Sequence, residues 1–318
     1  PFTKLNDKNF TPEVTILLPM RNESLNVERK IAEISRIDYP SRMMRILVID
    51  SGSDDNTAAL ARNYLSTMCP NQSWEVISIE KPGKSIAVNE ALGAIESEFF
   101  VMMDADAYCE SDCLRKMMAR FSDERIGAVS GMMLVDDGGY DPYRHRFNTI
   151  RVAESIQDST PIFEGSICGF RISSIGSKLL NPDINADDSQ LAMIVRSNGF
   201  RAVMDPSITF REESKISRKR LLRRSQGLSR ILIRNLNLCH SHGKYSTIMI
   251  QTVFFYVAMP WMFLSSSALL ISGISLMFIE GNIKLALWKK VLIALFTTFL
   301  VLKNRTARSF LFGVSISI

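Results

Sequence analysis

Cysteine is scarce in this 318-residue chain, and neither an internal repeat nor a low-complexity linker divides it. The five cysteines are odd in number and scattered, which is untypical of a disulfide framework and fits a reducing compartment. The Cys-x-x-Cys spacing of common structural zinc sites is also absent. The length therefore predicts one domain of ordinary size with an appendage, stabilised by neither disulfides nor zinc.

An apolar stretch is missing from the first residues, PFTKLNDKNF, where a secretory signal peptide would carry one. Together with the cysteine pattern, this predicts that the main domain faces the cytoplasm. The net charge of +5 is modest, so the placement of the charges says more about partners than their sum does.

Acidic residues are missing from one segment, and all charged residues from the next. The segment RKRLLRRSQGLSRILIR, Arg218 to Arg234, carries seven basic residues and no acidic one. Between Lys244 and Glu280 there is no charged residue, and this run exceeds the roughly 20 residues that a membrane-spanning helix needs. We expect the apolar run to lie in a bilayer, and the basic run to contact anionic head groups or a phosphorylated substrate at its surface.

Two membrane spans are predicted, at about 252–279 and 285–302. The apolar part of the second, VLIALFTTFLVL, is short and crosses a bilayer only if flanking lysines extend toward an interface. A hairpin would place Lys303, Arg305 and Arg308 on the same side as the arginine-rich segment, as the positive-inside rule expects. Alternatively, the first run is an interfacial piece that bends into a single span.

The rest of the chain alternates short apolar runs with amphipathic helical patterns. The expected strands are 14–18, 45–50, 74–79, 99–106 and 126–134, and the expected helices begin near 25, 56, 85 and 147. Strand and helix repeated at this spacing are typical of an α/β fold with a parallel sheet flanked by helices. Such a sheet binds ligands beyond the carboxyl ends of its strands.

Polar side chains follow the predicted strands at this edge. They are Asn22, Glu23, Asp50, Lys84, Asp104 and Asp106. Because alternate residues of a strand point the same way, we expect the carboxylates of Asp104 and Asp106 to face one site. Two carboxylates can hold a divalent cation, which would neutralise a diphosphate leaving group. The alternative is a solvated turn at the end of the strand.

Five motifs resemble, in order, those of glycosyltransferase family 2. This family of inverting enzymes with the GT-A fold includes cellulose-synthase-like and polyprenyl-phosphate sugar transferases. The motifs are ILLPMRNES, RILVIDSGSDDNT, KPGKSIAVNEALGAIESEFFVMMDADA, FEGSICGFRISSIG and NADDSQLAMIVRSNGFR, between residue 14 and about residue 227. The resemblance implies a Rossmann-like, mixed and mostly parallel sheet, a UDP- or GDP-sugar donor, and Mg²⁺ or Mn²⁺ as cofactor. It also implies a catalytic domain, 1–235, that includes the basic segment 215–235, and a membrane region, 246–318.

The same resemblance implies roles for the residues of the edge. Glu23 and Asp50 would contact the base and the ribose of the donor. Lys84 would lie near the base or the diphosphate. Asp104 would contact the ribose or the metal, and Asp106 would ligate the metal.

Asp188 matches the general base of the family's Glu-Asp-x-x-Leu motif, in the local sequence Asp187-Asp188-Ser189-Gln190-Leu191. Such a base takes the proton of an acceptor hydroxyl as that oxygen attacks the anomeric carbon, and direct displacement inverts this centre. Asp187 replaces the usual glutamate and is expected to support the loop or the site from outside.

The basic segment departs from the family pattern. Many membrane-integrated relatives carry a Gln-x-x-Arg-Trp motif that lines the acceptor channel. The register set by Gly227 puts Arg220, Arg223 and Arg224 at the glutamine, arginine and tryptophan positions. The missing tryptophan argues against a polysaccharide-extruding synthase. Arginines in these places suit a phosphate, on the donor or on a lipid acceptor, and equally suit anionic head groups.

Other functions fit the sequence less well. A nucleotidyltransferase usually has a glycine-rich loop after its first strand, and Pro19-Met20-Arg21-Asn22-Glu23 is no such loop. An inactive membrane scaffold predicts broken catalytic positions, whereas Asp104, Asp106 and Asp188 are all present. A nucleic-acid-binding protein would interleave aromatic residues with its basic run. The acceptor stays open between a lipid, such as polyprenyl phosphate or a glycolipid, and a growing polysaccharide.

Overall fold

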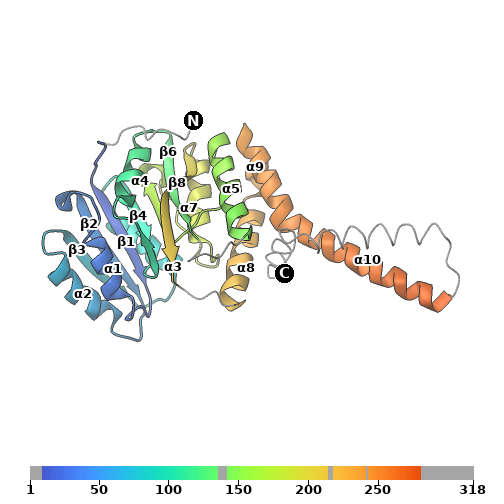
Figure 1. Cartoon of the computed structure of the whole chain (residues 1–318), viewed down its shortest axis with the longest axis horizontal. Coiled ribbons are helices and arrows are strands. Elements are labelled where there is room, and N and C mark those ends of the chain that lie inside the picture. The colour runs from blue at the N-terminus through green and yellow to red at the C-terminus, as the bar shows by residue number, and fades with distance from the viewer. Residues whose placement is uncertain (1–8, 135–141, 214–217, 241–242, 281–318) are drawn as a thin grey trace.

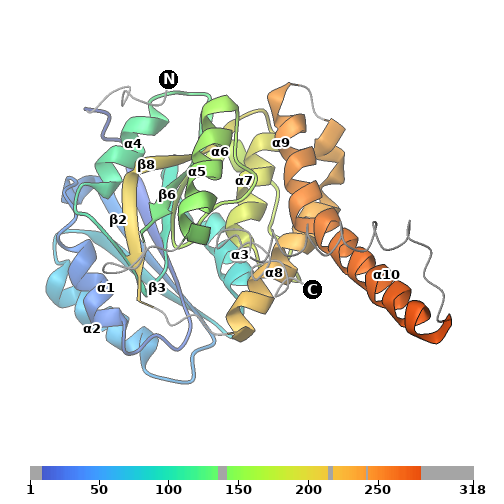
Figure 2. The ribbon, with the colours of Figure 1, turned by 45° about the vertical axis from the view of Figure 1, so that its right-hand side comes forward.

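A single sheet forms the centre of the protein, and helices cover both of its faces (Figures 1 and 2). The computed structural model describes residues 9–134, 142–213, 218–240 and 243–280. The strands are β1 (Val14–Met20), β2 (Met44–Ser51), β3 (Ser73–Ile79), β4 (Phe99–Met103), β5 (Ala107–Cys109), β6 (Ile126–Met133), β7 (Ile167–Arg171) and β8 (Arg201–Glu212). Their order in the sheet is β3-β2-β1-β4-β7-β6-β8-β5.

The sheet is mixed and mostly parallel, as predicted. Strand β1 pairs in parallel with β2 and β4, and β2 with β3. Strands β6 and β8 are also parallel, whereas β7 runs antiparallel to both of its neighbours and β5 runs antiparallel to β8. Parallel neighbours need long crossovers, and helices provide most of them.

The helices pack along the sheet or extend away from it. They are α1 (Val27–Ile34), α2 (Thr57–Met68), α3 (Lys84–Ala94), α4 (Cys113–Phe121), α5 (Pro142–Gln157), α6 (Ile172–Ile175), α7 (Asp187–Ser197), α8 (Arg218–Arg234), α9 (Lys244–Val253) and α10 (Met259–Glu280). Short 3₁₀ turns lie at Ser41–Met43 and Leu236–His240.

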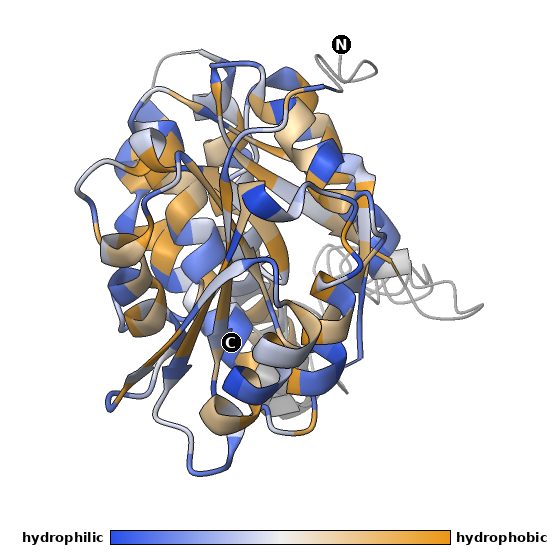
Figure 3. Ribbon diagram, turned by 90° about the vertical axis from the view of Figure 1, so that its left-hand side faces the viewer, coloured by the Kyte–Doolittle hydropathy of each residue, from blue (hydrophilic) through white to orange (hydrophobic). Residues whose placement is uncertain are grey.

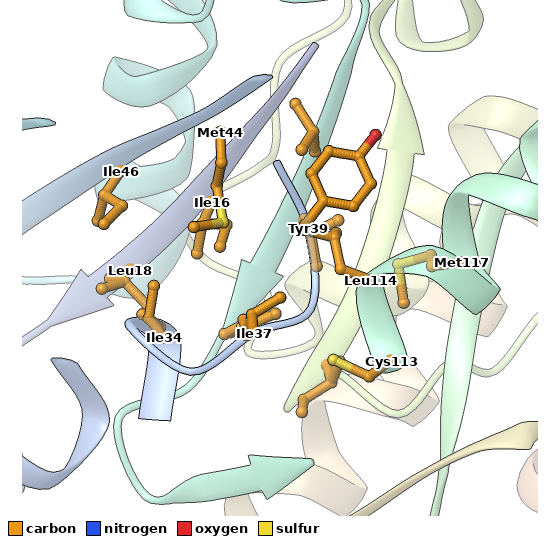
Figure 4. Packing of buried hydrophobic residues seen from close by; sticks show 14 of the residues in the cluster. Ile16, Leu18, Ile34, Ile37, Tyr39, Met44, Ile46, Cys113, Leu114 and Met117 are labelled. Carbon is orange, nitrogen blue, oxygen red and sulfur yellow. The ribbon is translucent and has the colours of Figure 1, made fainter. Parts of the chain in front are cut away.

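Both faces of the sheet are buried, which explains why its strands are apolar without interruption. On β1, Ile16 and Leu18 pack with Ile34 of α1 and Met44 of β2 in one core (Figure 4). Their neighbour Leu17 belongs to a second core on the opposite face. Figure 3 shows the resulting pattern, with hydrophobic stretches along the strands and hydrophilic segments in the loops around them.

Two strand ends differ from the sequence prediction by two residues or more. Strand β1 continues through Pro19 to Met20, because its pairing with β4 stops at Leu17 and only β2 remains beside it there. A proline lacks an amide hydrogen and is tolerated where a strand has lost one neighbour. The predicted strand 99–106 is wrong at its end, since β4 stops at Met103 and a turn separates it from β5.

One continuous helix, Lys244–Glu280, projects from the domain beyond α8 (Figures 1 and 2). A π-helical segment, Phe254–Ala258, joins α9 to α10 just before Pro260, whose ring cannot be accommodated in a regular helical interior. Among the described residues, only Lys244–Gly273 is long and apolar enough to cross a membrane. The predicted span 285–302 and its flanking basic residues lie outside the described part of the chain.

The first part of this helix packs against α7 and α8. Tyr245 and Met249 are buried in a third core with Met193 of α7 and Leu232 of α8. Several apolar side chains from this point on are exposed, namely Ile250, Phe254, Phe255, Trp261, Met262, Phe263 and Leu264. The predicted membrane region that begins at 246 therefore contains a turn of helix that belongs to the folded domain.

We predict that Met249→Ala destabilises the protein by about 2–5 kcal/mol, because it leaves a cavity in the third core. Ile250→Ala is the matched control, since this neighbouring side chain is 53% exposed and its loss should cost no more than about 0.5 kcal/mol. Denaturant unfolding of the full chain in detergent measures both. Equal effects of the two substitutions would mean that α9 does not pack on the domain.

Candidate active site

The carboxyl ends of β2, β1 and β4 lie next to each other, because β1 pairs in parallel with the other two. The register places Met20, at the end of β1, beside Asp50 of β2. Asp104 directly follows the last residue of β4. Asp50, Glu23 and Asp104 therefore lie at or just beyond the same edge of the sheet, as the sequence predicted.

Asp50 and Glu23 are held by the loops that follow their strands. The Asp50 carboxylate is nearly buried and accepts a hydrogen bond from Ser53 Oγ, which accepts one from the Asn22 amide at 2.9 Å. Asn22 has a φ of 56°, in the left-handed region that asparagine tolerates. The Glu23 carboxylate accepts a hydrogen bond from Asn26 Nδ2 at 2.7 Å. The two acidic groups are thus fixed in place before any ligand arrives.

Asp104 and Asp106 lie in the turn between β4 and β5 rather than on a strand. The Asp104 amide donates to the Ser166 carbonyl at 2.9 Å, and the Ala107 amide donates to the Asp104 carbonyl at 3.3 Å. Strand alternation therefore does not direct the two carboxylates, and that part of the sequence argument is wrong. The bond to Ser166 continues the pairing of β4 with β7 by one residue, and the turn closed by the Ala107 amide then separates β4 from β5.

Lys84, the first residue of α3, joins two distant parts of the chain. Its Nζ lies 2.7 Å from Asp104 Oδ1 and 3.3 Å from Asp187 Oδ2. The side chains of Lys84, Asp104 and Asp187 are 32%, 19% and 14% exposed, so water screens these ion pairs only in part. Burial disfavours the ammonium, but the charges of Asp104 and Asp187 outweigh it and raise the pKa of Lys84.

Asp188, the second residue of α7, has the acid–base property that a general base needs. Burial raises its pKa to about 7; the adjacent charge of Asp187 adds to the rise, and Lys84 opposes it. Its Oδ1 accepts a hydrogen bond from the Ser189 amide at 2.7 Å. A carboxyl group that titrates near neutral pH can take up a proton and release it again.

The loop Glu164–Gly165 packs against Asp188, although sequence reasoning assigned neither residue a role. A Cβ on Gly165 would lie 2.8 Å from Asp188 Oδ2, so only glycine fits beside the carboxylate. Glu164 is buried and forms an ion pair with Arg144 of α5. Its charge contributes to the raised pKa of Asp188. Glu164 and Gly165 belong to the motif FEGS, which could be recognised in the sequence, but the motif gave no sign that Gly165 lies against Asp188.

Helix α8 brings one of the predicted arginines toward the site. Arg224 Nη2 lies 3.2 Å from Glu212 Oε1 at the end of β8. Burial opposes its charge, but Glu212, Glu164, Asp188 and Asp104 together raise the pKa of Arg224. The Arg224 side chain is 45% exposed, and acidic residues from different parts of the site contribute to its raised pKa.

The other two predicted arginines, Arg220 and Arg223, lie on the same helix as Arg224. Arg223 is exposed on the same helix, and the side chain of Arg220 lies outside the described part of the structure. Helix α8 approaches the loop before Asp187 closely at Gly227, where a Cβ would lie 2.3 Å from the Asn185 carbonyl oxygen. Gly227 thus sets how near α8 can come to the loop that carries Asp188.

The donor set at Asp104 and Asp106 fits a hard divalent cation. Among the described residues, no group of three or more His, Cys, Asp or Glu side chains could hold a metal. Mg²⁺ and similar ions are usually bound by one or two carboxylates together with substrate phosphates. The two aspartates therefore suit a cation that is shared with a diphosphate.

Residues 15–177 match the family model for glycosyl transferase family 2. The beta-monoglucosyldiacylglycerol synthase of Trichormus variabilis is 30% identical over 122 residues, which are 37% of this chain and 25% of that protein. The poly-beta-1,6-N-acetyl-D-glucosamine synthase of Staphylococcus epidermidis is 28% identical over 120 residues, 37% of this chain and 28% of that protein. The match thus spans only about a quarter of the length of these relatives.

Two solved structures extend the comparison. A mannosyltransferase from Pyrobaculum calidifontis, in complex with GDP-Man and Mn²⁺, superimposes with a TM-score of 0.83 and 25% identity, over 100% of this chain and 88% of that one. TarS from S. aureus has a TM-score of 0.57 and 14% identity, over 78% of this chain and 73% of that one. The second likeness concerns the fold alone.

We predict that Asp187→Asn lowers the pKa of Asp188 below about 7, because it removes the neighbouring negative charge that raises it. Asp188 is protonated below its pKa and ionised above it, so its titration midpoint moves to lower pH. Carboxyl ¹³C NMR of aspartate-labelled protein measures this, with Asp188→Asn to assign the signal. Asp183→Asn, at an exposed position of the same loop, is the control and should leave the midpoint in place. An unchanged midpoint in Asp187→Asn would mean that the charge of Asp187 does not raise the pKa of Asp188.

Proposed function

Because the chain belongs to glycosyl transferase family 2, we propose that it is a membrane-bound, inverting glycosyltransferase. It moves a sugar from a UDP- or GDP-sugar to a lipid-linked acceptor such as polyprenyl phosphate or a glycolipid. The observation that supports this most is the cluster of Lys84, Asp104, Asp187 and Asp188 at the carboxyl edge of the sheet. In it, the carboxyl group of Asp188, with a pKa of about 7, shares a charged cluster with Asp104, one of the two proposed metal ligands.

The donor occupies the edge formed by the ends of β1, β2 and β4. Glu23 and Asp50 contact the base and the ribose, where both carboxylates are already oriented by loop hydrogen bonds. Asp104 and Asp106 would hold Mg²⁺ or Mn²⁺, which would supply positive charge to neutralise a diphosphate leaving group. Lys84 lies at the diphosphate end of this site, because its ammonium contacts Asp104.

Asp188 acts as the general base. It accepts the proton of the acceptor hydroxyl while this oxygen attacks the anomeric carbon opposite the diphosphate, so the configuration inverts. A pKa of about 7 gives a substantial ionised fraction at neutral pH and keeps the group basic enough to take up a proton. The charge of Asp187 helps to keep the pKa of Asp188 raised, and Asp187 also forms an ion pair with Lys84.

A lipid-linked acceptor is supported by the surroundings of Asp188. The pKa of Arg224 is raised by Glu212, Glu164 and Asp188, so its guanidinium can bind an acceptor phosphate on the side of the site that Asp188 occupies, and Arg223 and Arg220 share its helix. The same helix leads into the apolar helix that begins at Lys244. One relative is named for the synthesis of a glucosyl lipid.

A processive polysaccharide synthase is the second candidate, favoured by the relative that is named for poly-N-acetylglucosamine synthesis. The tryptophan that stacks an acceptor sugar in such enzymes is replaced by Arg224. An arginine at that point favours a charged acceptor over a neutral sugar ring.

The proposed domain organisation follows the sequence prediction with one adjustment. Residues 1–235 form the catalytic domain, with 215–235 at the membrane surface, and α9 completes its core. Residues 252–279 form a membrane span in this proposal, and the second predicted span, 285–302, lies outside the described residues. The catalytic domain faces the cytoplasm, and the protein has no nucleic-acid partner.

We predict that Asp188→Asn lowers the transfer rate by at least about a thousandfold while the affinity for the nucleotide sugar changes less than about threefold, because the base acts on the acceptor. Calorimetry and a radiolabel transfer assay measure the two quantities. In the wild type, kcat/KM should rise as pH increases through about 7, since the ionised form of Asp188 is the active one. Loss of donor affinity in Asp188→Asn would place this residue in the donor site.

We predict that membranes holding the wild-type protein transfer label from one UDP- or GDP-sugar into material that organic solvent extracts. Arg224→Ala should reduce this label more than Arg223→Ala, because Arg224 pairs with Glu212 at the end of β8 and its pKa responds to the charge of Asp188. Asp188→Asn provides the blank. Label that remains in an insoluble or aqueous polymer would instead identify a polysaccharide synthase.

A further inference from the structure

Strand β5 lies at one of the two edges of the sheet, and its first residue, Ala107, directly follows Asp106. It pairs with β8 on one side only, and the polar backbone groups on its other side need partners from elsewhere. Helix α1 supplies them. Lys30 Nζ donates to the Ala107 carbonyl at 2.6 Å, and Glu33 Oε1 accepts from the Cys109 amide at 2.7 Å. Two side chains thus take the place of a neighbouring strand.

Lys30 and Glu33 are also bound to each other. Lys30 Nζ lies 2.7 Å from Glu33 Oε2, and the lysine side chain is 0% exposed. A fully buried ammonium is costly, and replacing such a pair with apolar residues is often neutral or stabilising. A role in stability alone therefore does not account well for its contact with Ala107, the residue that follows the turn of Asp104 and Asp106.

The other side of the same turn is held as well. The Glu213 amide donates to the Asp106 carbonyl at 3.0 Å. Arg29 of α1 stacks over the Tyr108 ring at 4.2 Å and forms an ion pair with Glu213. The carbonyl groups of Asp106 and Ala107 are therefore both tied to side chains or backbone outside the strand, and the backbone of Asp106 has little freedom to rotate.

We propose that Lys30 and Glu33 are positioning residues that fix the backbone at Asp106 so that its carboxylate is oriented for the cation before the donor binds. This inference rests on the proposed metal role of Asp106. Without the two side chains, β5 keeps its pairing with β8 but loses its outer partners, and the turn before it gains freedom. If the Asp106 carboxylate becomes ordered only when the metal binds, the cost of ordering it lowers the affinity for the metal.

The test measures how much Mn²⁺ the protein needs to bind UDP or GDP, whichever it binds better. Calorimetry in detergent gives the Mn²⁺ concentration at which nucleotide binding reaches half of its maximum. The main variant is Lys30→Met with Glu33→Leu, which removes both groups and leaves no unpaired charge. Its half-saturating Mn²⁺ concentration should rise about tenfold, as expected when groups that orient a metal ligand are removed. Glu33→Gln keeps an acceptor for the Cys109 amide and should give a smaller rise.

The matched control is Arg120→Met with Asp205→Leu, because Arg120 and Asp205 form another buried ion pair, between α4 and β8. It should leave the Mn²⁺ requirement unchanged even if the unfolding temperature falls. An Mn²⁺ requirement equal to the wild type in both Lys30→Met/Glu33→Leu and Glu33→Gln would overturn the inference, provided that Asp106→Ala raises it. If Asp106→Ala leaves the requirement unchanged, the proposed metal site itself is wrong, and the positioning role falls with it.

Discussion

The contact of one ammonium with two carboxylates holds the candidate site together. Lys84 at the start of α3 binds Asp104 after β4 and Asp187 at the start of α7. Like charges in a partly buried place repel strongly, and Asp188 lies beside Asp187 as well. Without the lysine, the end of β4 and the start of α7 would carry an uncompensated negative charge. Helix α3 connects β3 to β4, and its first residue, Lys84, supplies the positive charge that allows these acidic groups to lie at one edge of the sheet.

The sheet and this edge could be predicted because both follow from local patterns. Strands buried on both faces must be apolar without interruption, and runs such as the one at Val14–Leu18 show this directly. The polar residue after each run then falls at the carboxyl edge, which is how Asp50, Lys84 and Asp104 could be placed from sequence. Even Pro19 misled only about where β1 ends, because the missing partner strand there could not be seen in the sequence.

The parts that were missed depend on contacts between distant residues. The apolar run before Asp104 gives no sign that a turn follows Met103 and leads into β5, which pairs with the distant strand β8. The value of Asp187 as a partner of Lys84 was hidden for the same reason. Gly165 and Gly227 read as ordinary glycines, yet each marks a place where another segment comes too close for a side chain. A sequence records such approaches only as the absence of a Cβ, with nothing to say which partner requires it.

The packing of the C-terminal helix also bears on the chemistry. Ile184 and Met193 lie on either side of Asp188 in the chain, and both are buried in the core that contains Tyr245 and Met249 of α9. Close-packed interiors are stiff, so α7 and α9 move as one body. The exposed apolar side chains from Phe254 to Leu264 begin directly after this contact on the same continuous helix. The separation between Asp188 and the first exposed apolar turn of this helix is therefore set by side-chain packing rather than by a flexible linker, and the proposed base would serve an acceptor whose reactive group lies at one fixed distance from that turn.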